Sequence, residues 1–180
     1  MAEEQENSNT ELPQEIQEII PLVELTDKER ENFFKAFLSD SQYVGEEVIF
    51  DGQMTIKFRT LSTDETMEIY DQMRDDQISG RLTSDANYLT KLTSYKLGAS
   101  LMSANNVLFM PEVIRENFPV HTDKFEKENY LTKRSKQITS WPNFKFAGYI
   151  EAYRIFENKV LQLTKEIQTE NFWKAVKLSS

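Results

Sequence analysis

The sequence predicts a mainly α domain of the α+β class, a helical domain that carries one small β-hairpin. Apolar residues recur at helical spacing over most of the chain. Two capping-box patterns mark helix starts, and only one stretch joins alternating strand residues to a favoured turn. The 180 residues are enough for one domain. We predict an acidic segment over 1–25, disordered or ordered by a partner, and a single helical domain over 26–180.

The two capping boxes place the first helices. Thr26-Asp27-Lys28-Glu29 opens a helix over 27–38, and Ser62-Thr63-Asp64-Glu65 opens one that ends near Gly80. Ser84 caps a third, whose apolar residues repeat from Tyr88 to Met102. Further helices are expected over 112–117, over 126–138 and from Pro142 onward, the last on the spacing of Phe146, Ile150, Tyr153, Val160, Leu163 and Ile167.

The hairpin is predicted near 47–60. Val48-Ile49-Phe50 leads into Asp51-Gly52, and the following strand, 54–59, alternates with Met54, Ile56 and Phe58 on the inner side. A lone hairpin is marginal in water, so this face must lie on helices or the hairpin must pair with another strand. Asn105-Asn106 predicts a turn before a short extended piece over 107–109.

Composition excludes several functional classes. The chain has no cysteine and one histidine, which excludes a disulfide scaffold, a thiolate metal site and a cysteine nucleophile. Its five glycines form no phosphate-binding loop. The acidic start differs from a signal peptide, and no apolar run approaches the roughly 20 residues of a membrane span. We therefore expect a soluble intracellular protein with no membrane partner.

Charge is unevenly distributed along the chain. The net charge is −9, made up of −14 over residues 1–80 and +5 over residues 81–180. Such asymmetry is typical of two faces that attract each other, of one face for a partner, or of a long acidic segment beside an ordinary domain. The segment 124–145 carries six basic residues and interleaved aromatics, a composition that can bind single-stranded nucleic acid, although the acidic chain as a whole disfavours it.

No residue of the sequence lies in a pattern typical of a catalytic site. His121 lies in a predicted loop without a nucleophile pattern nearby, so it is expected to be an ordinary loop histidine. The carboxylates Asp71, Asp75 and Asp76 and the pair Glu46 and Glu47 do not match a calcium loop. We predict a protein that is not an enzyme and that has no cofactor and no metal.

The candidate partner-binding residues are aromatic and aliphatic clusters near the two ends of the chain. Aromatic anchors dominate the energetics of protein interfaces, and termini often lie outside the main core. The first choice is Phe172, Trp173 and Val176, and the second is Ile16, Ile19 and Ile20. The stripe of Phe33, Phe34 and Phe37 is expected to pack in the core.

Residues 45–110 combine, in order, the strand Met54–Arg59, the Phe58-Arg59-Thr60-Leu61 step into a capped helix, the small-residue centre Leu97-Gly98-Ala99-Ser100-Leu101 and the Asn105-Asn106 turn. This combination resembles that of the tail assembly chaperones and baseplate hub assembly proteins of tailed bacteriophages. The resemblance implies a non-enzymatic role through protein–protein contacts, as tail assembly chaperone or structural virion component. The implied partners are tape-measure or hub proteins, or further copies of the chain. The implied location is the host cytoplasm or the virion tail.

Two other functions stay open at this point. One is a cellular α-helical adaptor or regulator, including one that binds nucleic acid through segment 124–145. The other is an enzyme that uses the carboxylates with a divalent metal.

Overall fold

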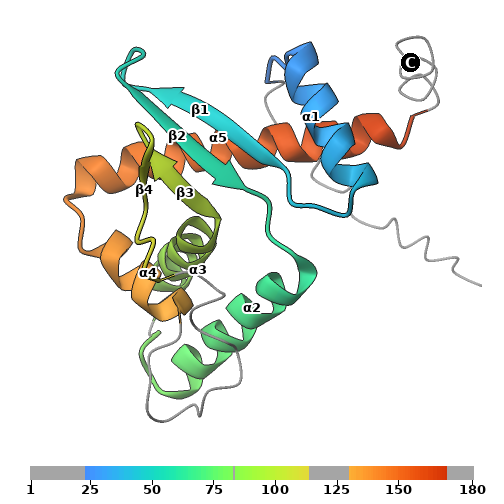
Figure 1. Cartoon of the computed structure of the whole chain (residues 1–180). Coiled ribbons are helices and arrows are strands. Elements are labelled where there is room, and N and C mark those ends of the chain that lie inside the picture. Colours follow the sequence, from blue (N-terminus) through green and yellow to red (C-terminus); the bar gives the residue numbers. More distant parts are fainter. Residues whose placement is uncertain (1–22, 83, 114–129, 170–180) are drawn as a thin grey trace, which may run out of the picture.

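The computed structural model describes residues 23–82, 84–113 and 130–169. These ranges hold helices and strands of one small sheet, which confirms the mainly α, α+β class (Figure 1). In chain order the elements are α1 (Asp27–Leu38), β1 (Val44–Ile49), β2 (Met54–Arg59), α2 (Thr63–Ile78), α3 (Asp85–Ser100), β3 (Leu101–Ala104), β4 (Val107–Leu108), α4 (Tyr130–Thr139) and α5 (Asn143–Ile167).

Both predicted capping boxes form. At α1 the Glu29 amide donates to Thr26 Oγ1 at 3.2 Å, and the Thr26 amide donates to Glu29 Oε2 at 2.8 Å. Ser62 and Glu65 make the same reciprocal pair at α2. Each box satisfies two backbone donors that a helix start leaves open, which is why these boundaries are readable in the sequence.

The predicted hairpin is half of a four-stranded antiparallel sheet with the order β1-β2-β3-β4. β1 starts earlier than expected, and Phe50 belongs to the turn rather than to the strand. Phe50, Asp51 and Gly52 all have positive φ, and the Gln53 amide donates to the Phe50 carbonyl at 3.0 Å. Only the glycine adopts this backbone without cost, so the turn is held by the strands on either side.

A second hairpin completes the sheet. Asn105 and Asn106 have φ of 46° and 63° between β3 and β4, the left-handed pair that a tight two-residue hairpin needs. The Asn105 amide donates to the Thr55 carbonyl, and the Thr55 amide donates to Asn105 Oδ1, both at 2.8 Å. The predicted turn is therefore confirmed, and part of the expected extended piece is β4.

The single-hairpin prediction was incomplete because α3 ends at Ser100. Helical spacing continues to Met102, but Leu101 turns into an extended backbone and pairs with Phe58 of β2. Ser100 Oγ also donates to the Arg59 carbonyl at 2.6 Å. Pairing with β2 thus takes over from helix continuation, a tertiary effect that a periodic pattern does not record.

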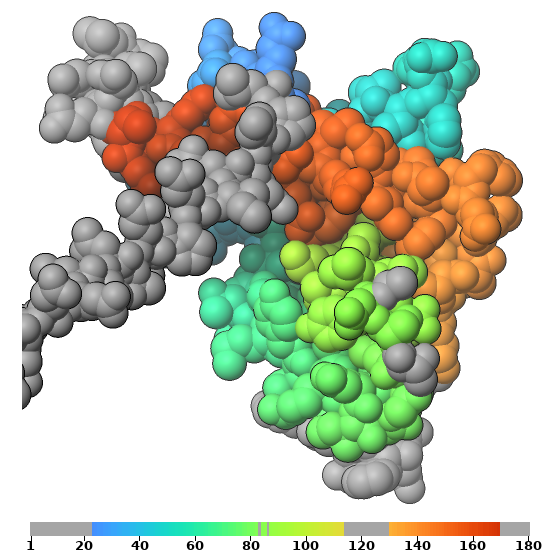
Figure 2. Space-filling model, turned by 180° about the vertical axis from the view of Figure 1, so that it is seen from behind, coloured from blue at the N-terminus to red at the C-terminus, as the bar shows by residue number. Residues whose placement is uncertain are grey.

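One hydrophobic cluster lies between the sheet, α5 and α1. Ile56 and Phe58 of β2 are fully buried, as predicted, and Phe58 packs on Tyr153 and Phe156 of α5 with ring centroids 5.5 Å apart. Helix α5 runs behind the sheet, and no described helix covers the front of the sheet (Figure 1). From behind, α5 forms a band across the molecule above α3 (Figure 2).

A second cluster joins α2, α3 and α4. Its largest buried members are Ile69, Met73, Tyr95 and Leu131. Gly98 lets α3 and α4 approach closely, since a Cβ at this position would lie 3.3 Å from the Ser135 amide nitrogen. The small-residue centre of α3 is thus a packing surface for α4.

Two helix predictions need correction, and a third is confirmed. In α1, Phe33 is buried and Phe34 is half-buried, but Phe37 is 53% exposed, so the stripe that was expected in the core is only partly buried. Residues 111–113 form a turn instead of opening a helix, and residues 114–117 lie outside the described ranges. α5 spans Asn143–Ile167 directly after Trp141-Pro142, as the spacing predicts.

Candidate functional site

A groove of about 700 Å³ lies where the uncovered side of the sheet meets α2 and α4. Its polar side is formed by Arg59 at the end of β2, by the first turn of α2 and by Tyr130 and Arg134 of α4. Its apolar side includes Met102, Leu108, Phe109 and Pro111. The groove is therefore lined by charged side chains on one side and by apolar side chains on the other.

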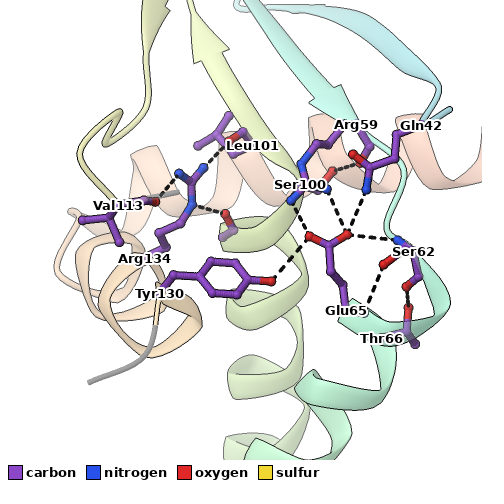
Figure 3. Close-up of polar contacts among 11 residues, drawn as sticks. Gln42, Arg59, Ser62, Glu65, Thr66, Ser100, Leu101, Val113, Tyr130 and Arg134 are labelled. Atoms are coloured by element: carbon purple, nitrogen blue, oxygen red, sulfur yellow. Dashed lines mark hydrogen bonds and ion pairs between the residues drawn. The ribbon is translucent and has the colours of Figure 1, made fainter. Parts of the chain in front are cut away.

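Glu65 organises the polar wall (Figure 3). Arg59 donates to both carboxylate oxygens, at 2.6 Å to Oε1 and 2.9 Å to Oε2. Oε2 also accepts from Gln42 Nε2 at 2.9 Å and from the Ser62 amide at 3.0 Å, and the Tyr130 hydroxyl lies 3.4 Å from Oε1. Such bidentate, charge-assisted bonds fix the arginine relative to α2.

The Glu65 network is suited to positioning rather than to proton transfer. The carboxylate is 1% exposed and is bonded by donors from β2, from the N-cap of α2, from α4 and from the segment before β1. A general base needs an oxygen within reach of a substrate proton. Here both oxygens hold the elements around the groove together.

Arg134 supports the far side of the groove (Figure 3). It is 5% exposed and donates Nε to the Gly98 carbonyl at 2.6 Å, Nη1 to the Phe109 and Val113 carbonyls at 3.0 Å, and Nη2 to the Leu101 carbonyl. Burial, with a smaller contribution from the charge of Arg59, lowers the pKa of Arg134 to about 10. The guanidinium therefore satisfies carbonyls at the end of α3, in β3 and in the segment after β4.

Other buried charges are also paired. Asp76 of α2 accepts from the Tyr95 hydroxyl at 2.8 Å and from Arg81 Nη2 at 2.7 Å. Burial, and then the bond to Asp76, raises the pKa of Tyr95. These contacts fix the end of α2 to α3.

Lys159 of α5 joins α1 to β1. Its Nζ lies 2.8 Å from Glu29 Oε1 and 3.0 Å from Glu47 Oε2. Burial raises the pKa of Glu47 and outweighs the bond from Lys159. Burial acts in the same direction on Glu29, but its hydrogen bonds to Lys159 and Thr26 together lower the pKa of that carboxyl. Glu47 Oε1 is buried without a hydrogen-bond partner.

The predicted partner-binding residues lie outside the described part of the chain. This holds for Phe172, Trp173 and Val176 and for Ile16, Ile19 and Ile20. His121, which was expected to be an ordinary loop histidine, also lies outside the described ranges. The structure therefore leaves those predictions as they stand.

The basic segment 124–145 does not form one exposed basic surface where it is described. Arg134 is buried among carbonyls, and Lys145 Nζ lies 4.2 Å from the centroid of the Trp141 ring. Trp141 itself packs on Phe109 and Tyr149. Within the described residues 130–145 of this segment, Phe144 is an exposed aromatic side chain, at 74%.

The predicted carboxylate groups are separated by the fold. Asp71 pairs with Arg74 at 3.0 Å on the surface of α2, whereas Asp76 is buried; Glu46 pairs with Lys57 at 2.9 Å on the opposite side of the sheet from Glu47. No group of three or more histidines, cysteines or acidic residues with metal-ligand geometry occurs in the described ranges. Within the same ranges, none of the helices is both long and apolar enough to cross a bilayer.

Comparison with known proteins gives no relative: neither family models, nor curated sequences, nor solved structures match this chain.

Sequence reasoning missed the Glu65 and Arg134 networks. Glu65 was explained fully by the capping box, and Arg134 was counted with the basic segment. A signal was present, because Tyr130, Leu131, Arg134, Ser135 and Ile138 lie on one side of α4 and all are buried. A single arginine among otherwise uncharged residues on one helix side predicts a buried guanidinium that needs carbonyl or carboxylate partners.

Proposed function

We propose that this protein is a non-enzymatic binding protein of a tailed bacteriophage, acting through protein–protein contacts as a tail assembly chaperone or as a structural part of the tail or baseplate. The proposal of a phage role rests on the resemblance of residues 45–110. The proposal of a binding role rests on the surface around the groove.

The observation that carries the binding role is the uncovered side of the sheet. Val44 and Val48 of β1 face away from α5 and are 43% and 59% exposed. The strand register places Leu108 of β4, 63% exposed, on the same side. Apolar side chains on an open sheet beside a groove are typical of a surface that binds another chain.

The polar side chains of the groove support the same proposal. Glu65 and Arg134 are held in place by bonds within the chain, so they provide a rigid wall. A rigid surface loses less conformational freedom when a partner binds.

Mass spectrometry of purified phage particles, with a pull-down of the tagged protein from the infected host, tests the proposal. Fixed stoichiometry in the particle would assign a structural role. A chaperone role would be assigned if the protein is absent from the particle but captures a tail protein from the lysate. The V48S/L108S variant should weaken that capture. The control is L161S, because Leu161 is a 40% exposed residue of α5. If the protein is absent from the particle and captures no tail protein, the phage role is rejected and a cellular adaptor is favoured.

A further inference from the structure

We propose that the outer side of α2 is a separate docking surface for a basic amphipathic helix of a partner protein. The inference rests on the proposed binding function and names a different surface from the sheet. It follows from the apolar residues that α2 exposes and from the charges around them.

Helix α2 is buried along one side only. Glu65, Ile69, Met73 and Asp76 are its buried residues, and among described elements it packs against α3. Met67, Tyr70 and Ile78 are 61%, 49% and 78% exposed. Together with Arg74 these residues are spaced 3, 4 and 4 apart in the sequence, which places them along one side of a helix.

We name Met67, Tyr70, Arg74 and Ile78 the α2 stripe. The stripe extends over about three helical turns. An amphipathic partner helix contacts such a surface through apolar residues at i, i+3, i+4 and i+7. The side chain of Arg74 is 64% exposed and pairs with Asp71 at the margin of the stripe. The stripe therefore consists of three apolar side chains and one arginine, whose charge is paired with Asp71.

The charge of α2 selects the partner. Thr63–Ile78 holds six carboxylates and one arginine. Glu65 and Asp76 are buried and paired with Arg59 and Arg81, which lie outside the helix. Asp64, Glu68, Asp71 and Asp75 are exposed or half-exposed, so four carboxylates accompany one guanidinium around the stripe. The last turn contains no basic residue to offset the negative end of the helix.

An acidic apolar surface disfavours nucleic acid and anionic membranes, because phosphate groups repel carboxylates. It suits a helix whose apolar side is flanked by lysine and arginine. Such a partner would bury Met67 and Ile78 and place its cations near Asp64 and Asp71.

Selection of random helical peptides on the immobilised full-length chain tests the inference. We expect enriched peptides with a positive net charge and an apolar side. One enriched peptide is then synthesised, and its Kd is measured by fluorescence anisotropy at low and high salt. M67S/I78S should weaken binding about tenfold or more, since central apolar residues dominate such interfaces, and added salt should weaken binding to the wild type.

The matched control is L89S/L161S, which changes two exposed leucines on helices other than α2. The urea midpoint of each variant reports whether it is folded. The inference is overturned if no peptide is enriched, if enriched peptides lack a positive bias, or if the two double variants bind alike. A tail protein captured equally by wild type and M67S/I78S would keep the proposed function and reject this surface. Specific peptide binding without any tail or baseplate partner would keep the surface and reject the phage role.

Discussion

Replacement of Arg134 by leucine tests the role of the buried guanidinium. Three of its carbonyl bonds, to Gly98, Val113 and Leu101, are buried, and the fourth, to Phe109, is partly buried. A buried acceptor left without a donor costs about 1–3 kcal/mol. Two effects reduce this cost. Leucine removes the unfavourable desolvation of a buried charge, which the lowered pKa of Arg134 reveals. Water can also reach the partly buried Phe109 carbonyl from the groove.

The net loss expected for Arg134→Leu is about 3 kcal/mol in the free energy of unfolding, near the lower end for three orphaned carbonyls. For a chain of this size that corresponds to a fall in Tm of roughly 6–12 °C. Urea denaturation and differential scanning calorimetry measure the two quantities. The control is Arg154→Leu, because Arg154 is exposed on α5. A loss below about 1 kcal/mol, or equal losses in the two variants, would refute the assignment of Arg134 as a structural centre.

Three further predictions concern packing, pH and turn geometry. Gly45→Ala should destabilise the fold by about 1–3 kcal/mol in urea denaturation, because its Cβ would lie 2.9 Å from the buried Phe156 ring. The control Gly148→Ala should be nearly neutral, because the half-exposed Phe50 ring can move away. Equal effects of the two substitutions would contradict the prediction. The raised pKa of Glu47 means that its stabilising contribution is present at low pH and is lost as pH rises through that pKa. In urea titrations Glu47→Gln should therefore gain stability relative to wild type as the pH rises above the ordinary range of a carboxyl group; a constant difference would count against a raised pKa. Asn106→Val should cost about 1–2 kcal/mol by thermal unfolding, since φ of 63° disfavours a β-branched residue, whereas Asn106→Gly should not destabilise; similar melting for both would show that the turn relaxes.

The elements that the sequence predicted well are those decided by neighbours along the chain. The capping boxes at Thr26 and Ser62 act over three residues, so the starts of α1 and α2 are readable locally. Asn105-Asn106 predicts its turn for the same reason, since asparagine tolerates the left-handed backbone. The apolar alternation of Met54–Arg59 also identified the buried side of β2.

The candidate site was less predictable because its groups come from distant parts of the chain. Glu65 and Tyr130 are 65 residues apart, and Arg134 bonds to Gly98, 36 residues away. Nothing in the local pattern of Glu65 distinguishes a capping residue from the acceptor of a buried ion pair. The exposed positions of Phe37 and Ile78 likewise depend on which helix sides find a neighbour.

By itself the sequence determined the helical class, the caps, the turns and the acidic character of the first 80 residues, since these follow from propensity, spacing and composition. Only the tertiary structure decided that Leu101 leaves α3 to join the sheet, that Arg134 is enclosed by carbonyls and that α2 keeps one side exposed. The physical reason is that burial and hydrogen-bond partners are set by contacts between distant segments, and those contacts override local preference wherever the two conflict.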